Sequence, residues 1–376
     1  MYIINRRLAS GVEDLLKINK VILIHGTRRG GKTFLLKKLT EAYPGKYKWL
    51  NGEDFDIQEL LKNRSAANYK RLIGDVELLV IDEAQMIPEI GRVLKLMIDS
   101  NQQLTILATG SSSFDLMNKT GEPLTGRKRS FMLYPIAQME LGKDILESKS
   151  MLEERLIFGS YPELFNLEGN DHKTIYLKEL IQSYLLKDIL SFSGIRHSEK
   201  IVGLLRLIAY QVGSEVSYQE IAAQLGINKL TVENYLDLLS KVFIIYKLPA
   251  YSTNQRKELS KTVKWYFYDN GIRNAIINDF RMPVLRNDIG LLWENYILSE
   301  RIKRNAYNGR IVECFFWRNY NQQEVDLIEL ENGQLHAFEC KLTLNKKIKI
   351  PPAFATAYPD ALFDVIHKEN YLDFIV

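Results

Sequence analysis

Cysteine is scarce in this sequence, and long apolar runs are missing from it. The 376 residues include two cysteines, Cys314 and Cys340, which excludes the disulfide framework of a small secreted domain. No apolar run approaches the ~18 residues that a membrane-spanning helix needs. The N-terminal segment has no apolar core followed by a small-residue cleavage site. We therefore expect a cytoplasmic protein without a secretory signal or a membrane partner.

A strong excess of either charge is also missing. Lys and Arg number 50 against 46 Asp and Glu, which gives a formal net charge of +4. Net charge alone therefore does not indicate nucleic-acid binding, and any surface that contacts phosphates must be locally basic. A length of 376 residues exceeds the ~100–200 residues of a typical domain, which predicts several domains.

The strongest motif is KVILIHGTRRGGKTFLLKKL, near the N-terminus. An apolar strand, the pattern G-x-x-x-x-G-K-[ST] and an amphipathic helix follow one another, as a phosphate-binding loop requires. Backbone N–H groups would surround the phosphates, Lys32 would contact the β- and γ-phosphates, and Thr33 would bind Mg²⁺. The predicted nucleotide-binding residues are Gly26, Thr27, Arg28, Arg29, Gly30, Gly31, Lys32, Thr33 and Phe34.

An acidic pair follows the next strongly apolar strand, in VELLVIDEAQMIP. We expect Asp82 to organise the Mg²⁺ of bound ATP and Glu83 to orient and polarise the attacking water. An acidic pair after an apolar strand is weak evidence alone, but here it comes after a phosphate loop. The two motifs predict an α/β fold with a parallel sheet that binds and hydrolyses ATP.

Two later positions are weaker candidates. In QLTILATGSSS, either Thr109 or Ser111 could sense the γ-phosphate, or these residues could instead cap the next helix. In LTGRKRSFMLYPI, Arg127 could act on the nucleotide of a neighbouring subunit, which requires a homo-oligomer such as a ring. Because surface arginines are common, a solvent-exposed Arg127 without this role is the alternative.

The order of these motifs, together with GSYPEL at Gly159–Leu164, resembles the AAA+-type P-loop ATPases of prokaryotes that carry domain of unknown function 4143. The resemblance covers nearly the whole chain. It implies ATP and Mg²⁺ as cofactors, Arg127 as an arginine finger, a winged helix and a nuclease-like C-terminal domain. The expected domains are an ATPase core at 1–140, a helical lid at 141–197, a winged helix at 198–280 and a nuclease-like DUF4143 domain at 281–376.

A helix-turn-helix pattern occupies residues 216–248. Ser217 and Glu220 form a capping box, and Gly226 supplies the turn. The outward face of the second helix carries Glu233 and Asp237, whose charges oppose DNA phosphates. The following segment is a more basic wing, with Arg256, Lys257, Lys261 and Lys264. DNA binding and a protein-binding or spacer role both stay open for this module.

The C-terminal segment QEVDLIELENGQLHAFECKL predicts a β-hairpin that turns at ENG. The hairpin would gather Asp326, Glu339 and Lys341 at one end, and Glu294 on an upstream helix could join them. Carboxylates can hold Mg²⁺ or Mn²⁺ for phosphodiester cleavage, and Lys341 would stabilise the transition state. This pattern resembles the PD-(D/E)XK restriction-endonuclease-like superfamily. The alternative is an ion pair on an exposed strand, which contributes little.

Two functions are compatible with these motifs. The first is an ATP-hydrolysing AAA+ protein that is directed to DNA and has a metal-dependent nuclease tail. The second is a switch or scaffold ATPase that binds protein partners and has a catalytically silent tail.

Overall fold

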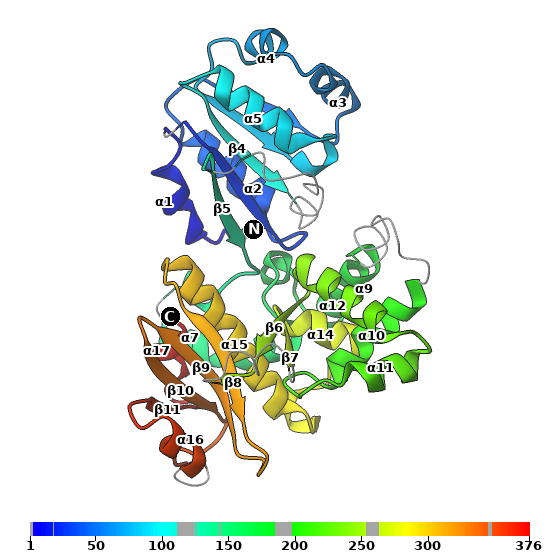
Figure 1. Ribbon diagram of the computed structural model, residues 1–376, viewed down its shortest axis with the longest axis vertical. Helices are drawn as coiled ribbons and strands as arrows, with labels where there is room; N and C mark the ends of the chain where they lie inside the picture. Colours follow the sequence, from blue (N-terminus) through cyan, green and yellow to red (C-terminus); the bar gives the residue numbers. More distant parts are fainter. Residues whose placement is uncertain are drawn as a thin grey trace. The chain divides into compact units, whose positions relative to one another are not determined.

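The chain folds into two compact units, an N-terminal unit of Ile3–Pro135 and a C-terminal unit of Ile136–Val376 (Figure 1). Among the described residues, none of the helices has the length and apolar character needed to cross a membrane. The computed structural model describes residues 3–17, 19–110, 124, 126–142, 144–184, 198–252, 263–344 and 348–376.

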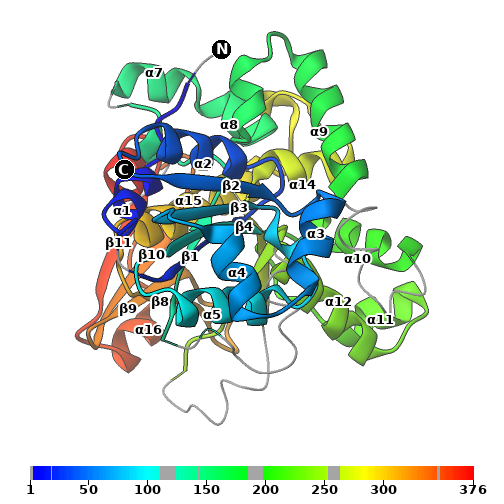
Figure 2. The ribbon, with the colours of Figure 1, turned by 90° about the horizontal axis from the view of Figure 1, so that it is seen from above.

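A five-stranded parallel sheet forms the centre of the N-terminal unit, with strand order β2-β3-β4-β1-β5. Its strands are β1 (Val21–Gly26), β2 (Tyr47–Asn51), β3 (Leu78–Asp82), β4 (Thr105–Gly110) and β5 (Lys128–Leu133). Strands β3 and β4 are buried along their whole length, as expected when both faces of a parallel sheet are covered. Figures 1 and 2 show α2 (Lys32–Glu41) and α5 (Ile90–Ser100) on opposite faces. The predicted α/β core with a parallel sheet is confirmed.

The described residues of this unit also form the helices α1, α3 and α4. The side chain of Asp54 accepts the N–H of Asp56 at the start of α3, and the side chain of Ser65 accepts the N–H of Asn68 at the start of α4. Such capping bonds satisfy backbone donors that a helix cannot satisfy internally. The helices are α1 (Leu8–Glu13), α3 (Phe55–Lys62) and α4 (Ala66–Ile73).

The first half of the C-terminal unit is mainly helical. The helix-turn-helix pattern predicted from the sequence corresponds to α11 and α12, with Gly226 in a left-handed conformation between them. The hydroxyl of Ser217 accepts the N–H of Glu220 at 3.4 Å. The elements are α7 (Ile145–Ser150), α8 (Leu152–Phe158), α9 (Asn170–Tyr184), α10 (Ser198–Tyr210), α11 (Tyr218–Leu225), α12 (Lys229–Lys241), β6 (Ile245–Pro249), β7 (Val263–Phe267) and α14 (Asn270–Ile277).

The second half contains a four-stranded sheet of order β11-β10-β9-β8, in which β10 and β11 are parallel. Strands β9 and β10 form the predicted hairpin, because Glu331 pairs with Gln334 across Asn332 and Gly333. Both turn residues have positive φ, as a tight two-residue hairpin turn requires. The elements are α15 (Ile289–Tyr307), β8 (Glu313–Arg318), β9 (Glu324–Glu331), β10 (Gln334–Cys340), α16 (Pro352–Ala357), β11 (Leu362–Ile366) and α17 (Tyr371–Ile375).

One hydrophobic core joins both halves of the C-terminal unit. It extends from Leu152 in α8 to Ile375 in α17 and includes the fully buried Trp293 of α15. The amide of Asn295 adds a polar link, since it bonds both the N–H and the C=O of Phe267 in β7. The segments predicted as a helical lid, a winged helix and a nuclease-like domain therefore share one hydrophobic core within a single compact unit.

Candidate functional site

The phosphate loop and the acidic pair lie at the same edge of the parallel sheet. Strands β1, β3 and β4 run in one direction, so their C-terminal ends meet there. Strand β4 lies between the other two. Its Gly110 pairs with His25 of β1, and its Ala108 pairs with Ile81 of β3. Ligands of open α/β sheets bind at this edge.

Glycine is required at two positions of the loop. Gly26 has a φ of +144°, and a Cβ there would lie 2.1 Å from the carbonyl oxygen of Leu133 in β5. Gly31 has a φ of +94° and directly precedes α2. Because L side chains rarely adopt such angles, these glycines allow the chain to turn from β1 into the helix N-terminus.

The side chain of Lys32 lies within the loop. Its Nζ donates to the carbonyl oxygens of Gly26 at 3.2 Å and Thr27 at 3.0 Å. Lys32 is buried, whereas Thr33 on the next position of α2 is exposed. The lysine is therefore held beside the backbone groups that are expected to surround phosphates, and the threonine hydroxyl is accessible to a metal ion.

Sequence analysis missed Arg6, which holds the loop from outside the motif. Its guanidinium is 7% exposed and donates to the carbonyl oxygens of Gly30 at 2.7 Å and Tyr134 at 2.6 Å. These bonds link the phosphate loop to the end of β5. A single arginine that binds backbone oxygens has no local sequence signal, so only the fold could reveal this role.

Thr109 connects the two acidic residues across neighbouring strands. Its hydroxyl donates to Asp82 Oδ1 and accepts the backbone N–H of Glu83 at 3.0 Å. The carboxylate of Glu83 accepts a bond from Gln85 at 2.5 Å. Within the described chain, both hydrogen bonds to the Asp82 carboxylate end on Oδ1, and none ends on Oδ2. With the exposed Thr33, this oxygen-rich donor set fits Mg²⁺.

The remaining candidates of this region differ in position. Phe34 is 40% exposed on α2, and Arg29 has a left-handed φ of 55° in the loop. Arg28 is half-buried. Ser111 lies outside the residues that the structure describes.

Arg127 lies at the opposite edge of the sheet from its own phosphate loop. It directly precedes β5, whose Lys128 pairs with Val21 at the start of β1. At about 3.3 Å per strand residue, roughly 17 Å separate this edge from Gly26. The guanidinium instead pairs with Asp99 at 2.6 Å, and it is 44% exposed. Arg127 therefore cannot reach the loop of its own chain.

In the C-terminal unit, the hairpin brings Asp326, Glu339 and Lys341 together. Leu327 pairs with Phe338, which places Asp326 across from Glu339. The Nζ of Lys341 lies 2.7 Å from Glu339 Oε1 and 3.5 Å from Asp326 Oδ2. Asp326 is 4% exposed, and its Oδ2 also accepts the N–H of Cys340 at 2.8 Å.

A second lysine and a tyrosine bind the neighbouring carboxylates. Tyr266 donates its hydroxyl to Glu294 Oε1 at 2.6 Å, and Lys264 Nζ lies 3.8 Å from the same oxygen. Lys264 also pairs with Glu324. The expectation that Lys264 belongs to an exposed basic wing is wrong. Lys264 is 1% exposed. Its charge is tolerated inside the unit because the carboxylates of Glu294 and Glu324 compensate it.

Glu294, Glu324, Asp326 and Glu339 form an acidic cluster, in which burial and mutual repulsion raise the pKa of Glu294 and of Glu339. Desolvation, followed by the charge of Asp326, raises the pKa of Glu294 to about 8. The same two causes raise the pKa of Glu339. Desolvation lowers the pKa of Lys264, but Glu294 and Glu324 outweigh it and the net shift is upward.

The metal site predicted at Glu294, Asp326 and Glu339 stays a prediction. Across the described ranges, no three His, Cys, Asp or Glu side chains are grouped so that they could hold a metal ion. The ammonium of Lys341 lies between Asp326 and Glu339, while Tyr266 and Lys264 bind Glu294. These carboxylates therefore bind protein cations and a hydroxyl in the positions where they were expected to bind Mg²⁺ or Mn²⁺.

A further carboxylate of the C-terminal unit, that of Asp269, caps a helix. Asp269 caps α14, because its Oδ1 accepts the N–H of Ile272 at 3.2 Å. Its second oxygen accepts the N–H of Ser160 at 2.7 Å. Arg256, Lys257 and Lys261 of the predicted wing lie outside the described residues.

Three stretches of the chain match known families. Residues 18–142 match the family described as AAA domain, residues 149–282 a domain of unknown function (DUF8612), and residues 289–371 a domain of unknown function (DUF4143). The chain thus carries an AAA-type ATPase domain followed by a DUF4143 domain, as the resemblance implied. The DUF8612 match at residues 149–282 was not predicted. The prediction for that stretch was a helical lid followed by a winged helix.

Relatives align with most of the chain. An uncharacterized protein of Mycobacterium tuberculosis is 26% identical over 352 residues, which cover 93% of this chain and 76% of the relative. An uncharacterized protein of Methanocaldococcus jannaschii is 26% identical over 384 residues, which cover 95% of this chain and 82% of the relative.

Two solved structures also show a distant likeness. The Aeropyrum pernix ORC1 protein in complex with DNA has a TM-score of 0.33 and 14% identity, covering 74% of this chain and 93% of its own. The Thermotoga maritima RuvB Holliday junction branch migration motor has a TM-score of 0.32 and 16% identity, covering 68% of this chain and 95% of its own. Both TM-scores are too low to carry an argument.

Proposed function

We propose that this chain is a Mg²⁺-dependent ATPase whose N-terminal unit binds and hydrolyses ATP. One observation carries the proposal: the phosphate loop and the Asp82–Glu83 pair meet at one edge of the parallel sheet, joined through Thr109. The match of residues 18–142 to an AAA domain supports it.

The chain's own groups have distinct tasks in this proposal. Backbone N–H groups of the loop and the N-terminus of α2 bind the phosphates, and Lys32 contacts the terminal ones. Thr33 and Asp82 hold Mg²⁺, which neutralises phosphate charge when it is bound. Glu83 orients the attacking water, and the Gln85 amide fixes the orientation of the Glu83 carboxylate.

Two substitutions test this assignment. Lys32→Ala removes the phosphate contact, so we expect binding of a fluorescent ATP analogue to be lost. Glu83→Gln keeps the shape of the side chain but not its charge, so we expect ATP to bind while phosphate release stops. Lys37→Ala changes an exposed lysine of the same helix and is the matched control. Normal hydrolysis by the Glu83 variant would refute the assigned role.

We also propose that Arg127 acts on the nucleotide of a neighbouring subunit in a homo-oligomer. The position of Arg127 at the far edge of its own sheet supports action in trans. Lys32→Ala and Arg127→Ala should each be inactive alone. Mixing them should restore part of the hydrolysis, because the Arg127→Ala subunit keeps a complete loop and receives an arginine from its partner. Mixtures that stay inactive would contradict action in trans.

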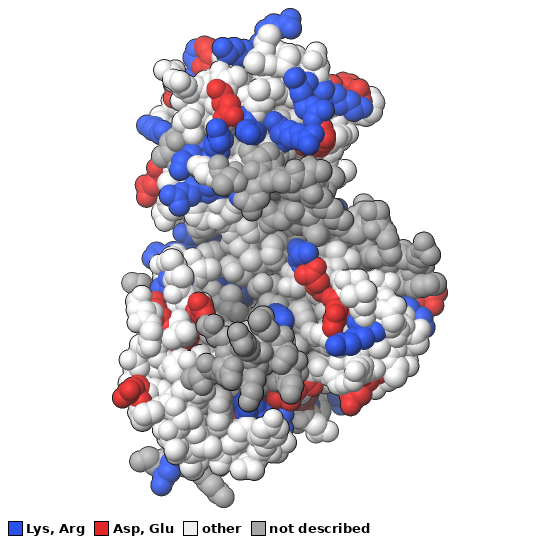
Figure 3. All heavy atoms as spheres, viewed as in Figure 1, with Lys and Arg blue, Asp and Glu red and all other residues white. Residues whose placement is uncertain are grey.

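For the C-terminal unit we propose that it transmits the ATPase cycle to a partner, either DNA or another protein. The described surface favours protein. Lys229 pairs with Glu233 and Lys241 with Asp237 on α12, and Lys264 is buried. On the face in Figure 3, Lys and Arg gather over the N-terminal unit, whereas the C-terminal unit is mostly uncharged.

One assay separates the two partners. ATP turnover is measured with and without linear, circular and single-stranded DNA, and cleavage of the same DNA is followed with Mg²⁺ or Mn²⁺. Unchanged turnover and intact DNA support a protein-directed switch with a silent tail. DNA-stimulated turnover supports the DNA-directed function. Cleavage that disappears in Lys341→Ala would establish the nuclease tail.

A further inference from the structure

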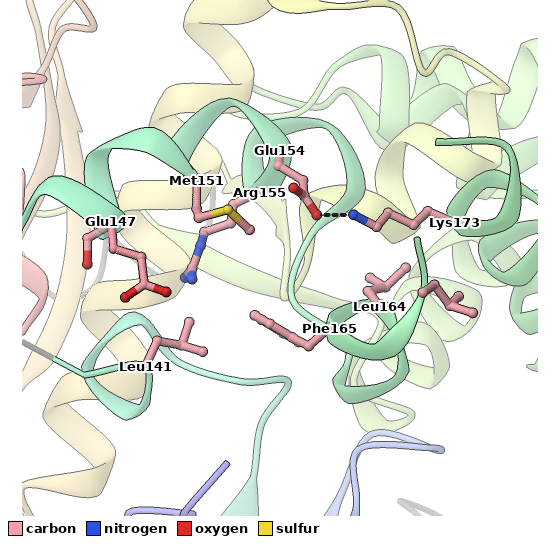
Figure 4. A pocket seen from close by; sticks show the side chains of 10 residues that line it. Leu141, Glu147, Met151, Glu154, Arg155, Leu164, Phe165 and Lys173 are labelled. Atoms are coloured by element: carbon pink, nitrogen blue, oxygen red, sulfur yellow. Dashed lines mark hydrogen bonds and ion pairs between the residues drawn. The ribbon is translucent and has the colours of Figure 1, made fainter. Parts of the chain in front are cut away.

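A cavity in the C-terminal unit is lined by residues that belong to neither region described above. It is partly open to solvent and is lined by α7, α8, the start of α9 and the 3₁₀ turn Pro162–Asn166, and its volume is about 190 Å³ (Figure 4). An apolar protein cavity of about 150 Å³ already binds benzene. This cavity can therefore hold a group as large as an aromatic or branched aliphatic side chain.

Arg155 of α8 extends into this cavity, as Figure 4 shows. The residue is 4% exposed, and its guanidinium lies 5.8 Å from the centre of the Phe165 ring. Its Nη1 donates to Gln138 Oε1 at 2.7 Å. Its Nε–H has no hydrogen-bond partner among the described residues, and none of their carboxylates forms an ion pair with it.

Other buried arginines of the same unit differ from Arg155 in this respect. Each of them forms an ion pair: Arg273 with Asp288, Arg286 with Asp288, and Arg301 with Glu329. A cation that is removed from water without a counter-charge is strongly unfavourable. Among the described residues, Arg155 therefore differs from these arginines in having no carboxylate within ion-pair distance.

The guanidinium is held in place and cannot simply turn out to solvent. Gln138 Oε1, which binds Arg155, also accepts the hydroxyl of Tyr296 at 3.0 Å. The Gln138 side-chain amide donates to Ser148 at 2.9 Å, and its backbone N–H donates to Glu300 at 2.6 Å. This network occupies Nη1 and leaves the buried Nε of Arg155 without a hydrogen bond among the described residues.

The charges around the cavity select a monoanion. Lys173, which also lines it, is paired with Glu154, whereas Arg155 forms no ion pair with the other carboxylate of the wall, that of Glu147. The carboxylates of Glu147 and Glu154 on the cavity wall disfavour a dianion such as phosphate. A planar carboxylate matches the two parallel N–H groups of a guanidinium edge. The rest of the wall is apolar and includes Leu141, Met151, Leu164, Phe165 and Leu167.

We propose that this cavity binds an organic monocarboxylate. The carboxylate accepts hydrogen bonds from the guanidinium of Arg155, and its apolar group lies against Met151 and Phe165. The proposal is independent of ATP hydrolysis, since every residue involved belongs to the C-terminal unit.

The test compares 4-methylpentanoate with 4-methylpentanamide, which has the same shape without the charge. Binding to the full chain is measured by calorimetry and by the NMR signal of the Arg155 Nε–H, assigned with the Arg155→Lys variant. We expect the acid to bind and to shift this signal, and the amide to bind at least about tenfold more weakly. Inorganic phosphate should also bind more weakly than the acid.

Three variants separate binding from folding. Arg155→Gln should weaken binding of the acid at least about tenfold, whereas Arg206→Gln, on exposed Arg206 of α10, should not. Met151→Trp should block the cavity while keeping Arg155, which covers the case in which Arg155→Gln fails to fold. Glu147→Gln should tighten binding by removing a competing carboxylate.

Three outcomes would overturn the proposal. The first is equal binding of acid and amide. The second is binding of the acid that neither Arg155→Gln nor Met151→Trp weakens. The third is the absence of carboxylate binding at millimolar concentration, which would mean that Glu147 itself neutralises Arg155.

Discussion

Two regions of this molecule place carboxylates near a lysine at the end of a β-strand, and the partners of those carboxylates differ. At the edge of the parallel sheet, Asp82 and Glu83 accept hydrogen bonds from neutral groups: a hydroxyl, an amide and a backbone N–H. At the hairpin of the C-terminal unit, Asp326 and Glu339 contact the ammonium of Lys341.

The difference concerns how much charge is left for a ligand. A carboxylate that is oriented by neutral donors keeps its negative charge and can bind a cation. A carboxylate paired with an ammonium has already compensated that charge, and a metal ion would have to displace the lysine. The same residue types therefore leave more negative charge for a cation in the first region than in the second.

The largest effect is expected from removing one charge at the sheet edge. Asp82→Asn keeps the hydrogen bond with Thr109 but weakens Mg²⁺ binding, so ATP turnover should fall at least about a hundredfold. Asp326→Asn makes the same chemical change in the acidic cluster and should leave turnover unchanged. Phosphate-release assays measure both, and equal losses in the two variants would break the distinction.

The next effect concerns the stability of the acidic cluster. Lys264→Met leaves Glu294 and Glu324 without their buried cation, which should lower the free energy of unfolding by about 3 kcal/mol. Lys241→Met, on an exposed lysine of α12, should change it by less than about 0.5 kcal/mol. Urea denaturation followed by tryptophan fluorescence compares them. A Lys264 variant as stable as the control would show that the cluster needs no internal cation.

The pH dependence of stability tests the acidic cluster through the titration of Glu294. The pKa of Glu294 is raised from 4.5 to about 8, so the folded protein keeps a proton that the unfolded chain loses above its ordinary pKa. Stability should therefore fall as pH rises from about 5 to 8, on the order of 1 kcal/mol per unit, and then level off. Glu294→Gln preserves the Tyr266 contact and should flatten this slope in urea titrations. An unchanged slope would assign the titration to another group.

The smallest effect is expected at Lys341. Its side chain is 45% exposed, and half-exposed ion pairs contribute less than about 1 kcal/mol. Lys341→Met should therefore leave stability and ATP turnover nearly unchanged. Differential scanning calorimetry measures the first. A large loss of stability would mean that Lys341 is as essential to the cluster as the buried Lys264.

Local sequence was sufficient for some features and insufficient for others. The strand–loop–helix around Lys32 and the hairpin turn at Asn332 follow from short-range patterns, because glycine conformation and strand alternation are local properties. The burial of Lys264 and the isolation of Arg155 depend on side chains more than 15 residues away, supplied by other elements. A pattern of basic residues therefore predicted an exposed wing where the fold placed a buried cation.

The bond from Arg6 to Gly30 has a practical consequence for dividing this protein into fragments. A fragment that starts at β1 contains every residue of the phosphate-loop motif and still lacks the side chain that ties the loop to Tyr134. In such a fragment the loop would have more conformations to lose when a nucleotide orders it, so affinity would fall although the motif is intact. The shortest autonomous nucleotide-binding piece of this chain therefore begins before its recognisable motif.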